Sequence, residues 1–191
     1  MPIILKAANK VPIYCATFLM LINIASAQEK SPMEVMISSG EKIVSEDRGV
    51  FIFDTTTRRK IELPSHLKRA LSTSSEIVFP EAVSRRLDGK DVFLIVVRVP
   101  SSTSPNGYCG AGSEDELYAV ELNGIVGKIV FSKKVNSCLD NIDLSNDGIN
   151  SSFESIKWVN NPVGISISWS KDQEGKESVR LYRRIKGGFK E

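Results

Sequence analysis

The stretch LYAVELNGIVGKIVF, residues 117–131, decides the fold class of this chain. Two runs rich in β-branched and aromatic residues flank Asn123-Gly124, the dipeptide that best tolerates the two positive φ angles of a type I′ turn. We therefore predict an antiparallel β-hairpin that is centred on this dipeptide and extends outward on both sides.

Two cysteines lie at equal distances from this turn, since Cys109 is 14 residues before Asn123 and Cys138 is 14 residues after Gly124. Residues equidistant from a tight turn face each other across a hairpin, so we expect a disulfide at its open end. The alternative is a pair of unpaired buried thiols. A bridge closing a loop of about 30 residues should stabilise the fold by about 3 to 4 kcal/mol. No Cys-x-x-Cys motif supports redox catalysis.

Further runs on both sides of this hairpin also predict strands. Residues 92–99 are almost continuously apolar and β-branched, which indicates a central strand covered on both faces. Runs at 50–53 and 59–63 predict a second hairpin. The later runs that predict a meander are 153–159, 163–169 and 179–185. In the middle one, apolar residues at 165, 167 and 169 share one face, and serines at 166, 168 and 170 share the other.

Helix signals are scarce in this sequence. Residues 65–71 predict one short helix, with Ser65 as its N-cap after Pro64. Residues 80–87 predict either a second short helix or one strand of a hairpin, because Asp88-Gly89 also favours a tight turn.

About nine short strands in succession favour a mainly β fold, an antiparallel β-sandwich or a partly open barrel with one or two short helices. The alternative is a propeller-like meander, because segments such as 49–54 and 117–124 are similar to the inner strands of propeller blades. A steady period of about 40 residues is missing, however. We expect a single β-rich domain over residues 28–191.

Residues 1–27 have the features of a cleaved secretory signal peptide. A start with two lysines is followed by an apolar run over residues 11–24 and by an A-x-A cleavage site at 25–27. This run of 14 residues is shorter than the roughly 20 that cross a bilayer, and Cys15 lacks the small preceding residue of a lipid-attachment site. We therefore expect a periplasmic or secreted protein without stable membrane insertion.

The charge balance argues against several kinds of partner. Of the 25 basic and 23 acidic residues, two lysines and no acid lie in residues 1–27, so the remainder is formally neutral. A neutral domain gives no electrostatic support for binding nucleic acid or an anionic membrane. Arg180, Tyr182 and Arg184 share one side of the last predicted strand, which we interpret as a solvated face or a protein contact.

Few residues point to catalysis. His66 is the only histidine, and no G-x-S-x-G, H-E-x-x-H or G-x-x-x-x-G-K-[ST] pattern occurs. The run Glu114, Asp115 and Glu116 supplies carboxylates of the kind glycosidases use, but acids adjacent in an extended chain alternate sides. A hydrolase acting on a cell-wall or extracellular polymer is therefore an alternative that requires carboxylates converging in a cleft.

One segment has the spacing of a calcium loop, in which oxygen ligands alternate around a glycine. The residues at positions 1, 3, 5, 6, 9 and 12 of that loop are Asp143, Ser145, Asp147, Gly148, Ser151 and Glu154. The spacing resembles an EF-hand loop over 12 residues, although Leu144 replaces a polar second position and no amphipathic helix precedes it. The alternative is a polar turn in which side chains bond the local backbone. A calcium-stabilised structural module is thus a second functional alternative.

Residues 100–116 form an unusually long stretch without apolar periodicity. Loops of this kind are often functional, and the alternative is a merely flexible connection. We predict that Tyr108, beside the disulfide, and the acidic residues Glu114, Asp115 and Glu116 bind another protein, because a tethered loop loses less entropy on docking. The leading hypothesis is therefore an exported, non-enzymatic binding domain, such as an inhibitor or immunity-type protein.

The segment Cys109-Gly110-Ala111-Gly112-Ser113-Glu114 resembles a Cys-Gly-Ala-Gly-x-Glu segment of small uncharacterised exported proteins of Gram-negative bacteria. The resemblance covers a dozen to about thirty residues. The resemblance implies a periplasmic location and no known activity.

Overall fold

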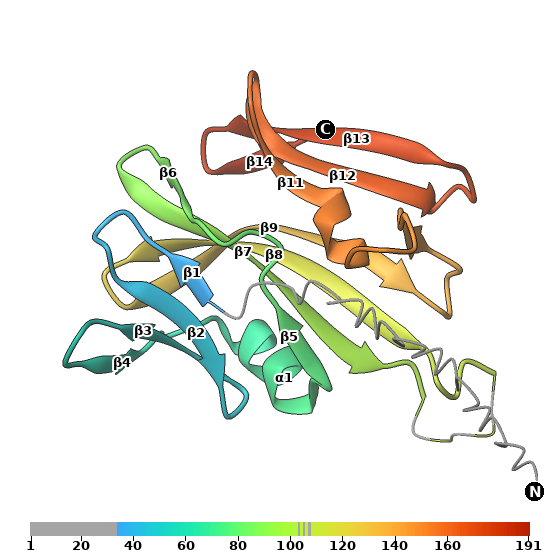
Figure 1. Ribbon diagram of the computed structural model, residues 1–191, viewed down its shortest axis with the longest axis horizontal. Coiled ribbons are helices and arrows are strands. Elements are labelled where there is room, and N and C mark those ends of the chain that lie inside the picture. The colour runs from blue at the N-terminus through green and yellow to red at the C-terminus, as the bar shows by residue number, and fades with distance from the viewer. Residues whose placement is uncertain (1–33, 103, 105, 107) are drawn as a thin grey trace, which may run out of the picture.

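The computed structural model describes residues 34–191, except 103, 105 and 107 (Figure 1). The predicted signal peptide, residues 1–27, and its Cys15 lie outside the described residues. The described chain is mainly β, with antiparallel sheets and one α-helix, which confirms the predicted sandwich-like architecture. Within this part of the chain, no helix has the length and apolarity needed to span a membrane.

A central sheet of five strands has the order β5-β7-β8-β9, and β6 also pairs with β7. Its strands are β5 (Glu76–Val78), β6 (Arg85–Leu87), β7 (Lys90–Pro100), β8 (Ser113–Asn123) and β9 (Val126–Ser137). Along β7, residues 92, 94 and 96 face one core and residues 93, 95 and 97 face a second core. The predicted central strand covered on both faces is therefore confirmed.

An N-terminal sheet covers one face of the central sheet together with the helix (Figure 1). Its strands are β1 (Glu34–Met36), β2 (Lys42–Glu46), β3 (Gly49–Phe53) and β4 (Arg58–Lys60), in that order. The helix α1 (Ser65–Thr73) buries Leu67 and Leu71 in this core. Pro64 is its N-cap and no side chain caps it, so the predicted capping role of Ser65 is wrong.

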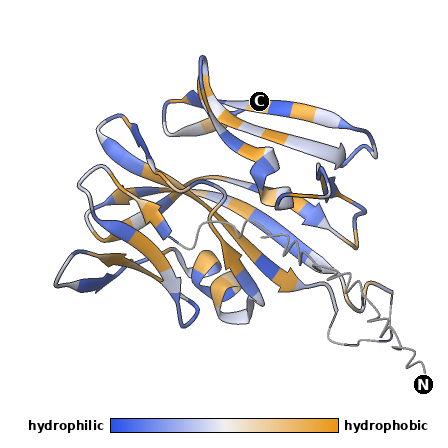
Figure 2. Cartoon of the chain, viewed as in Figure 1, coloured by the Kyte–Doolittle hydropathy of each residue, from blue (hydrophilic) through white to orange (hydrophobic). Residues whose placement is uncertain are grey.

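A C-terminal sheet covers the opposite face of the central sheet, so the molecule has three layers (Figure 1). Its elements are β10 (Asp143–Leu144), the 3-10 helix η1 (Ser152–Ser155), β11 (Ile156–Asn160), β12 (Val163–Lys171), β13 (Ser178–Ile185) and β14 (Gly188–Lys190). The predicted meander corresponds to β11, β12 and β13. Apolar and polar segments alternate along β12 and β13 (Figure 2). In the core, the Trp169 indole N–H donates a hydrogen bond to the Val135 carbonyl at 3.0 Å.

Of the two tight turns of the central sheet, one differs from its prediction and the other follows one of its two predicted alternatives. The main hairpin turns one residue later than expected, because Asn123 pairs with Val126 and only the glycine of Asn123-Gly124 has a positive φ. Residues 80–87 contain no helix, and β6 instead pairs with β7 across Asp88-Gly89, where both φ angles are positive. The hairpin alternative is thus confirmed for this segment.

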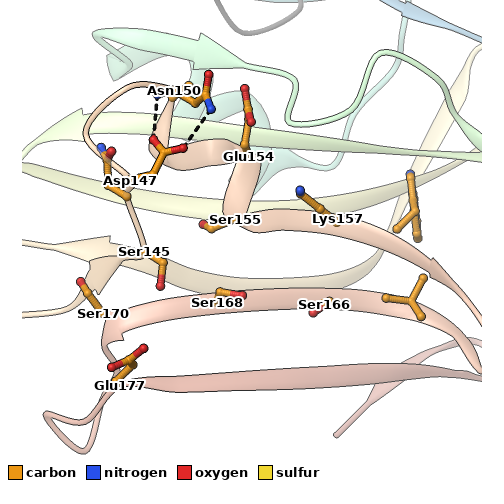
Figure 3. A pocket seen from close by; sticks show the side chains of 14 residues that line it. Ser145, Asp147, Asn150, Glu154, Ser155, Lys157, Ser166, Ser168, Ser170 and Glu177 are labelled. Carbon is orange, nitrogen blue, oxygen red and sulfur yellow. Dashed lines mark hydrogen bonds between the residues drawn. The ribbon is translucent and has the colours of Figure 1, made fainter.

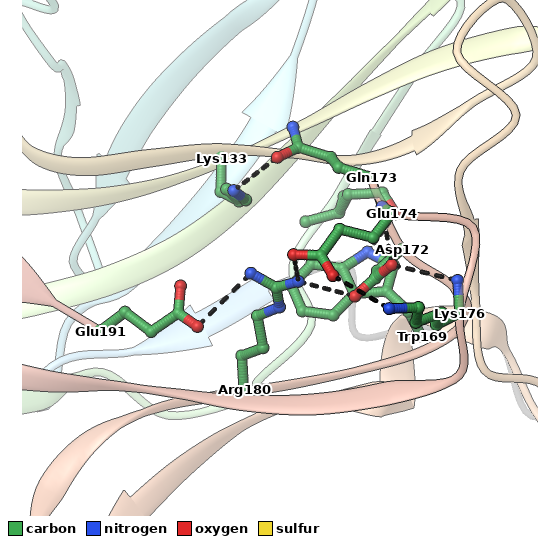
Figure 4. Close-up of polar contacts among 9 residues, drawn as sticks. Lys133, Trp169, Asp172, Gln173, Glu174, Lys176, Arg180 and Glu191 are labelled. Atoms are coloured by element: carbon green, nitrogen blue, oxygen red, sulfur yellow. Dashed lines mark hydrogen bonds and ion pairs between the residues drawn. The ribbon is translucent and has the colours of Figure 1, made fainter.

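The side of β13 that carries Arg180, Tyr182 and Arg184 faces inward rather than toward solvent. Tyr182 is buried in the core between the central and C-terminal sheets. Arg180 bonds Asp172 at 2.7 Å and Glu191 at 3.4 Å, as Figure 4 shows. The interpretation of this side as a solvated face is therefore wrong, since the arginines are held by carboxylates at the margin of the core.

Candidate functional site

The predicted disulfide between Cys109 and Cys138 is present, with a Cα–Cα distance of 5.8 Å. The hairpin symmetry that suggested it is not its cause, because Cys109 lies in the turn before β8. Gly112 lies directly against the bridge. A Cβ atom at this position would lie 2.5 Å from the Cys138 Cβ. A glycine at this position therefore leaves the space that the bridge occupies.

The segment that the bridge ties down is residues 101–112, which we call the tethered loop; its positions 103, 105 and 107 lie outside the described residues. Pro100 ends β7 and Ser113 begins β8, so this loop is shorter than the predicted stretch 100–116. The Ser101 amide donates to the Gly112 carbonyl at 3.0 Å and closes the base of the loop. Figure 1 shows the loop at one end of the central sheet, beyond the ends of β7 and β8.

Glu114 joins three segments at the base of the tethered loop. Its carboxylate accepts hydrogen bonds from the hydroxyls of Ser101 (2.8 Å) and Ser137 (2.5 Å) and from the Leu139 amide (3.2 Å). Lys134 lies 3.2 Å from the same group. Partial burial opposes ionisation, but the hydrogen bonds outweigh it and lower the pKa of Glu114 below its ordinary value. Glu114 therefore holds the loop base as a carboxylate.

The other two members of the acidic run are also bonded within the protein. Asp115 is 1% exposed and receives two hydrogen bonds from the Arg98 guanidinium, at 2.9 and 2.8 Å. Glu116 accepts a hydrogen bond from the Tyr118 hydroxyl at 2.8 Å. The predicted partner-binding role of Asp115 thus conflicts with its burial, because a partner cannot reach it.

Of the predicted partner-binding residues, Tyr108 is the most exposed, at 80%. Leu139 is 53% exposed and follows Cys138 directly, just as Tyr108 directly precedes Cys109. The bridge therefore brings two exposed apolar residues to the same end of the molecule.

The calcium-like segment adopts the local turn that was the alternative interpretation. The Asp147 carboxylate accepts hydrogen bonds from the amides of Ile149 (2.9 Å) and Asn150 (2.8 Å), and these lower its pKa. Asp143 lies in β10, and its carbonyl accepts from Ser170 at 3.3 Å. Among the described residues, no three His, Cys, Asp or Glu side chains are gathered as a metal ion would require.

The same segment forms one wall of a groove of about 730 Å³ on the C-terminal sheet, which we call the serine groove (Figure 3). Ser166, Ser168 and Ser170 of β12 run along it, on the face opposite Ile165, Ile167 and Trp169. The other side chains that line it are Ser145, Asn146, Asp147, Asn150, Ser151, Glu154, Ser155, Lys157, Trp158, Val159 and Glu177. Sequence reasoning found the serine row but did not connect it with the 145–155 segment.

Three carboxylates line this groove on two opposite sides. Asp147 and Glu154 come from the segment before β11, and Glu177 comes from the turn before β13. The carboxylates that share a groove are therefore residues other than Glu114, Asp115 and Glu116, on which the hydrolase alternative was based. Sequence spacing had singled out Asp147 and Glu154, but Glu177 lies in a polar turn without a distinguishing signal.

The single histidine lies far in the sequence from both features. His66 is exposed on α1, and its ring centroid is 6.0 Å from that of buried Tyr118. The tethered loop and the serine groove are therefore the two candidate sites.

Comparison of the chain with protein-family models, with curated proteins and with solved structures gives no match.

Proposed function

We propose that this protein is an exported binding protein that docks a protein partner through the tethered loop. The observation that carries the proposal is the 80% exposed Tyr108 on a loop anchored by a disulfide. Aromatic side chains contribute most strongly to protein interfaces, and an anchored loop loses little conformational entropy on binding. An inhibitor or immunity-type role is the form of binding that suits such a loop.

The base of the loop supports this assignment. Glu114 bonds Ser101 at one end of the loop, and the bridge joins Cys109 to Cys138 directly after β9, so Tyr108 is attached to a rigid sheet. Leu139, which follows Cys138 on the other side of the bridge, adds exposed apolar surface at the same end of the molecule. The disulfide also favours an oxidising compartment, which supports export to the periplasm or beyond the cell.

The proposal is tested by affinity capture with the oxidised protein against the exported proteins of the producing organism. We expect a stoichiometric partner that the Tyr108→Ala variant no longer retains. Ile149→Ala is the matched control, because Ile149 is 77% exposed on a different loop and its truncation should leave capture unchanged. Failure to capture a partner, or equal capture by wild type and Tyr108→Ala, would contradict the proposal.

A further inference from the structure

The serine groove contains polar side chains that the fold leaves available. Ser166, Ser168, Glu154 and Glu177 make no side-chain hydrogen bond or ion pair with any residue that the structure describes. The Lys157 side chain, which also lines the groove, likewise makes no hydrogen bond or ion pair with any described residue. All five side chains are exposed or partly exposed, so they can bond water or a ligand without losing a contact within the described part of the chain.

The floor of the groove is rigid. β12 is paired along both edges, with Ser166 opposite Lys157 of β11 and opposite Leu181 of β13. Ser168 lies opposite Val179 of β13, and its carbonyl accepts the Ser145 amide at 3.0 Å. Side chains held on a strand in the middle of a sheet keep fixed spacings, which lowers the entropy lost when a ligand binds.

One wall of the groove is fixed as well. Asp147 is held by Asn150 through a side-chain hydrogen bond of 2.9 Å in addition to its bonds to the backbone, as drawn in Figure 3. Glu154 projects from η1 on the same side, and Glu177 lies on the other side of the serine row (Figure 3). The groove therefore has hydroxyls along its floor and carboxylates on both sides.

The chemistry of these groups selects the ligand. Serine hydroxyls and asparagine amides both donate and accept hydrogen bonds, as the hydroxyls of a sugar do. An apolar ligand would leave the serines unsatisfied, which is costly. An anionic ligand would meet Asp147, Glu154 and Glu177 against the single cation Lys157, so it would be repelled.

We propose that the serine groove binds a neutral oligosaccharide. Its volume of about 730 Å³ lies within the range of roughly 300 to 1,000 Å³ that is typical of small-molecule sites. The proposal is independent of the tethered loop, because no residue of that loop lines the groove.

The test is a calorimetric titration of the oxidised protein with neutral hexasaccharides. The panel contains hexamers of β-1,4-linked glucose, N-acetylglucosamine, mannose and xylose and of α-1,4-linked glucose, with hexagalacturonic acid as the anionic comparison. We expect at least one neutral hexamer to bind and the anionic hexamer not to bind. Absence of binding by every neutral hexamer, or stronger binding of the anionic one, would overturn the proposal.

The decisive variant is Ser166→Val combined with Ser168→Val, which removes both free hydroxyls of the floor. Valine suits strand positions, so this variant should fold and melt at least as high as wild type. We expect its saccharide affinity to fall at least tenfold. Ser132→Val is the matched control, because Ser132 is an exposed strand serine on β9, away from the groove. Unchanged affinity in the double variant would overturn the proposal, whereas Tyr108→Ala should bind the saccharide normally.

Discussion

The acidic run at the tethered loop and the carboxylates of the serine groove use the same chemical group differently. Glu114, Asp115 and Glu116 are all bonded to neighbouring side chains. Glu154 and Glu177 make no such bond with any residue in the described part of the chain. The comparison teaches that the first set maintains the fold and that the second is free for a ligand, so mutations should separate stability from binding.

The largest expected effect is at Asp115. Truncation by Asp115→Ala leaves the Arg98 guanidinium without its bidentate partner and empties a site that is 1% exposed. We expect the free energy of unfolding to fall by about 3.5 kcal/mol, toward the lower end of the range for broken buried pairs, because Arg98 is partly exposed and keeps its ion pair with Glu76. Urea denaturation measures it. Glu154→Ala is the matched control and should change stability by less than about 0.5 kcal/mol; similar losses in both variants would contradict the comparison.

The second effect is that of the bridge. Replacement of both cysteines by Cys109→Ser and Cys138→Ser frees a segment with a sequence separation of 29 residues. We expect a loss of about 3 kcal/mol in unfolding free energy, because the unfolded chain regains the entropy that the closed loop removes. A reductant should produce the same loss in wild type and none in the double variant. A reductant effect that persists in the double variant would show that the bridge is not responsible.

The third effect depends on pH and tests Glu114 as the centre of the loop base. Glu114→Gln should lower the unfolding free energy by about 1.5 kcal/mol near neutral pH, since bonds to a charged acceptor are lost. The folded pKa of Glu114 lies below its ordinary 4.5, so its contribution is present above that value and is lost as the pH falls through the folded pKa. The stability gap between wild type and variant should therefore narrow at acid pH. A constant gap would contradict this role.

Much of the fold was predictable from local patterns. The apolar run 92–99 indicated a strand covered on both faces, and period-two alternation placed the serines of β12 on one side. The register of the main hairpin was not predictable, because distant contacts determine it. A Cβ atom at Gly127 would lie 2.9 Å from Leu63, and the Gly127 amide donates to the Glu62 carbonyl at 2.9 Å. The N-terminal layer thus fixes a register that the turn sequence alone assigns differently.

The candidate sites were less predictable for a related reason. The sequence marked Tyr108 and the disulfide correctly as features of one loop, but it gave no sign of which of the adjacent acids is buried. Whether a carboxylate is buried depends on the partner that another strand supplies, and Arg98 of β7 supplies it for Asp115. The serine groove needs β12, the segment before β11 and the turn at Glu177 together, which no local pattern links.

The smallest expected effect completes the comparison at the serine groove. Glu154→Gln and Glu177→Gln, singly or combined, should change the free energy of unfolding by about 0.5 kcal/mol or less, because no described residue pairs with either carboxylate. Any increase in the unfolding free energy of the combined variant should come from weaker repulsion between like charges. The increase should therefore appear at low ionic strength and vanish at high salt. Thermal melts at two salt concentrations measure it. A loss above about 1 kcal/mol would mean that these carboxylates support the fold as Glu114 does, and the distinction between the two regions would fail.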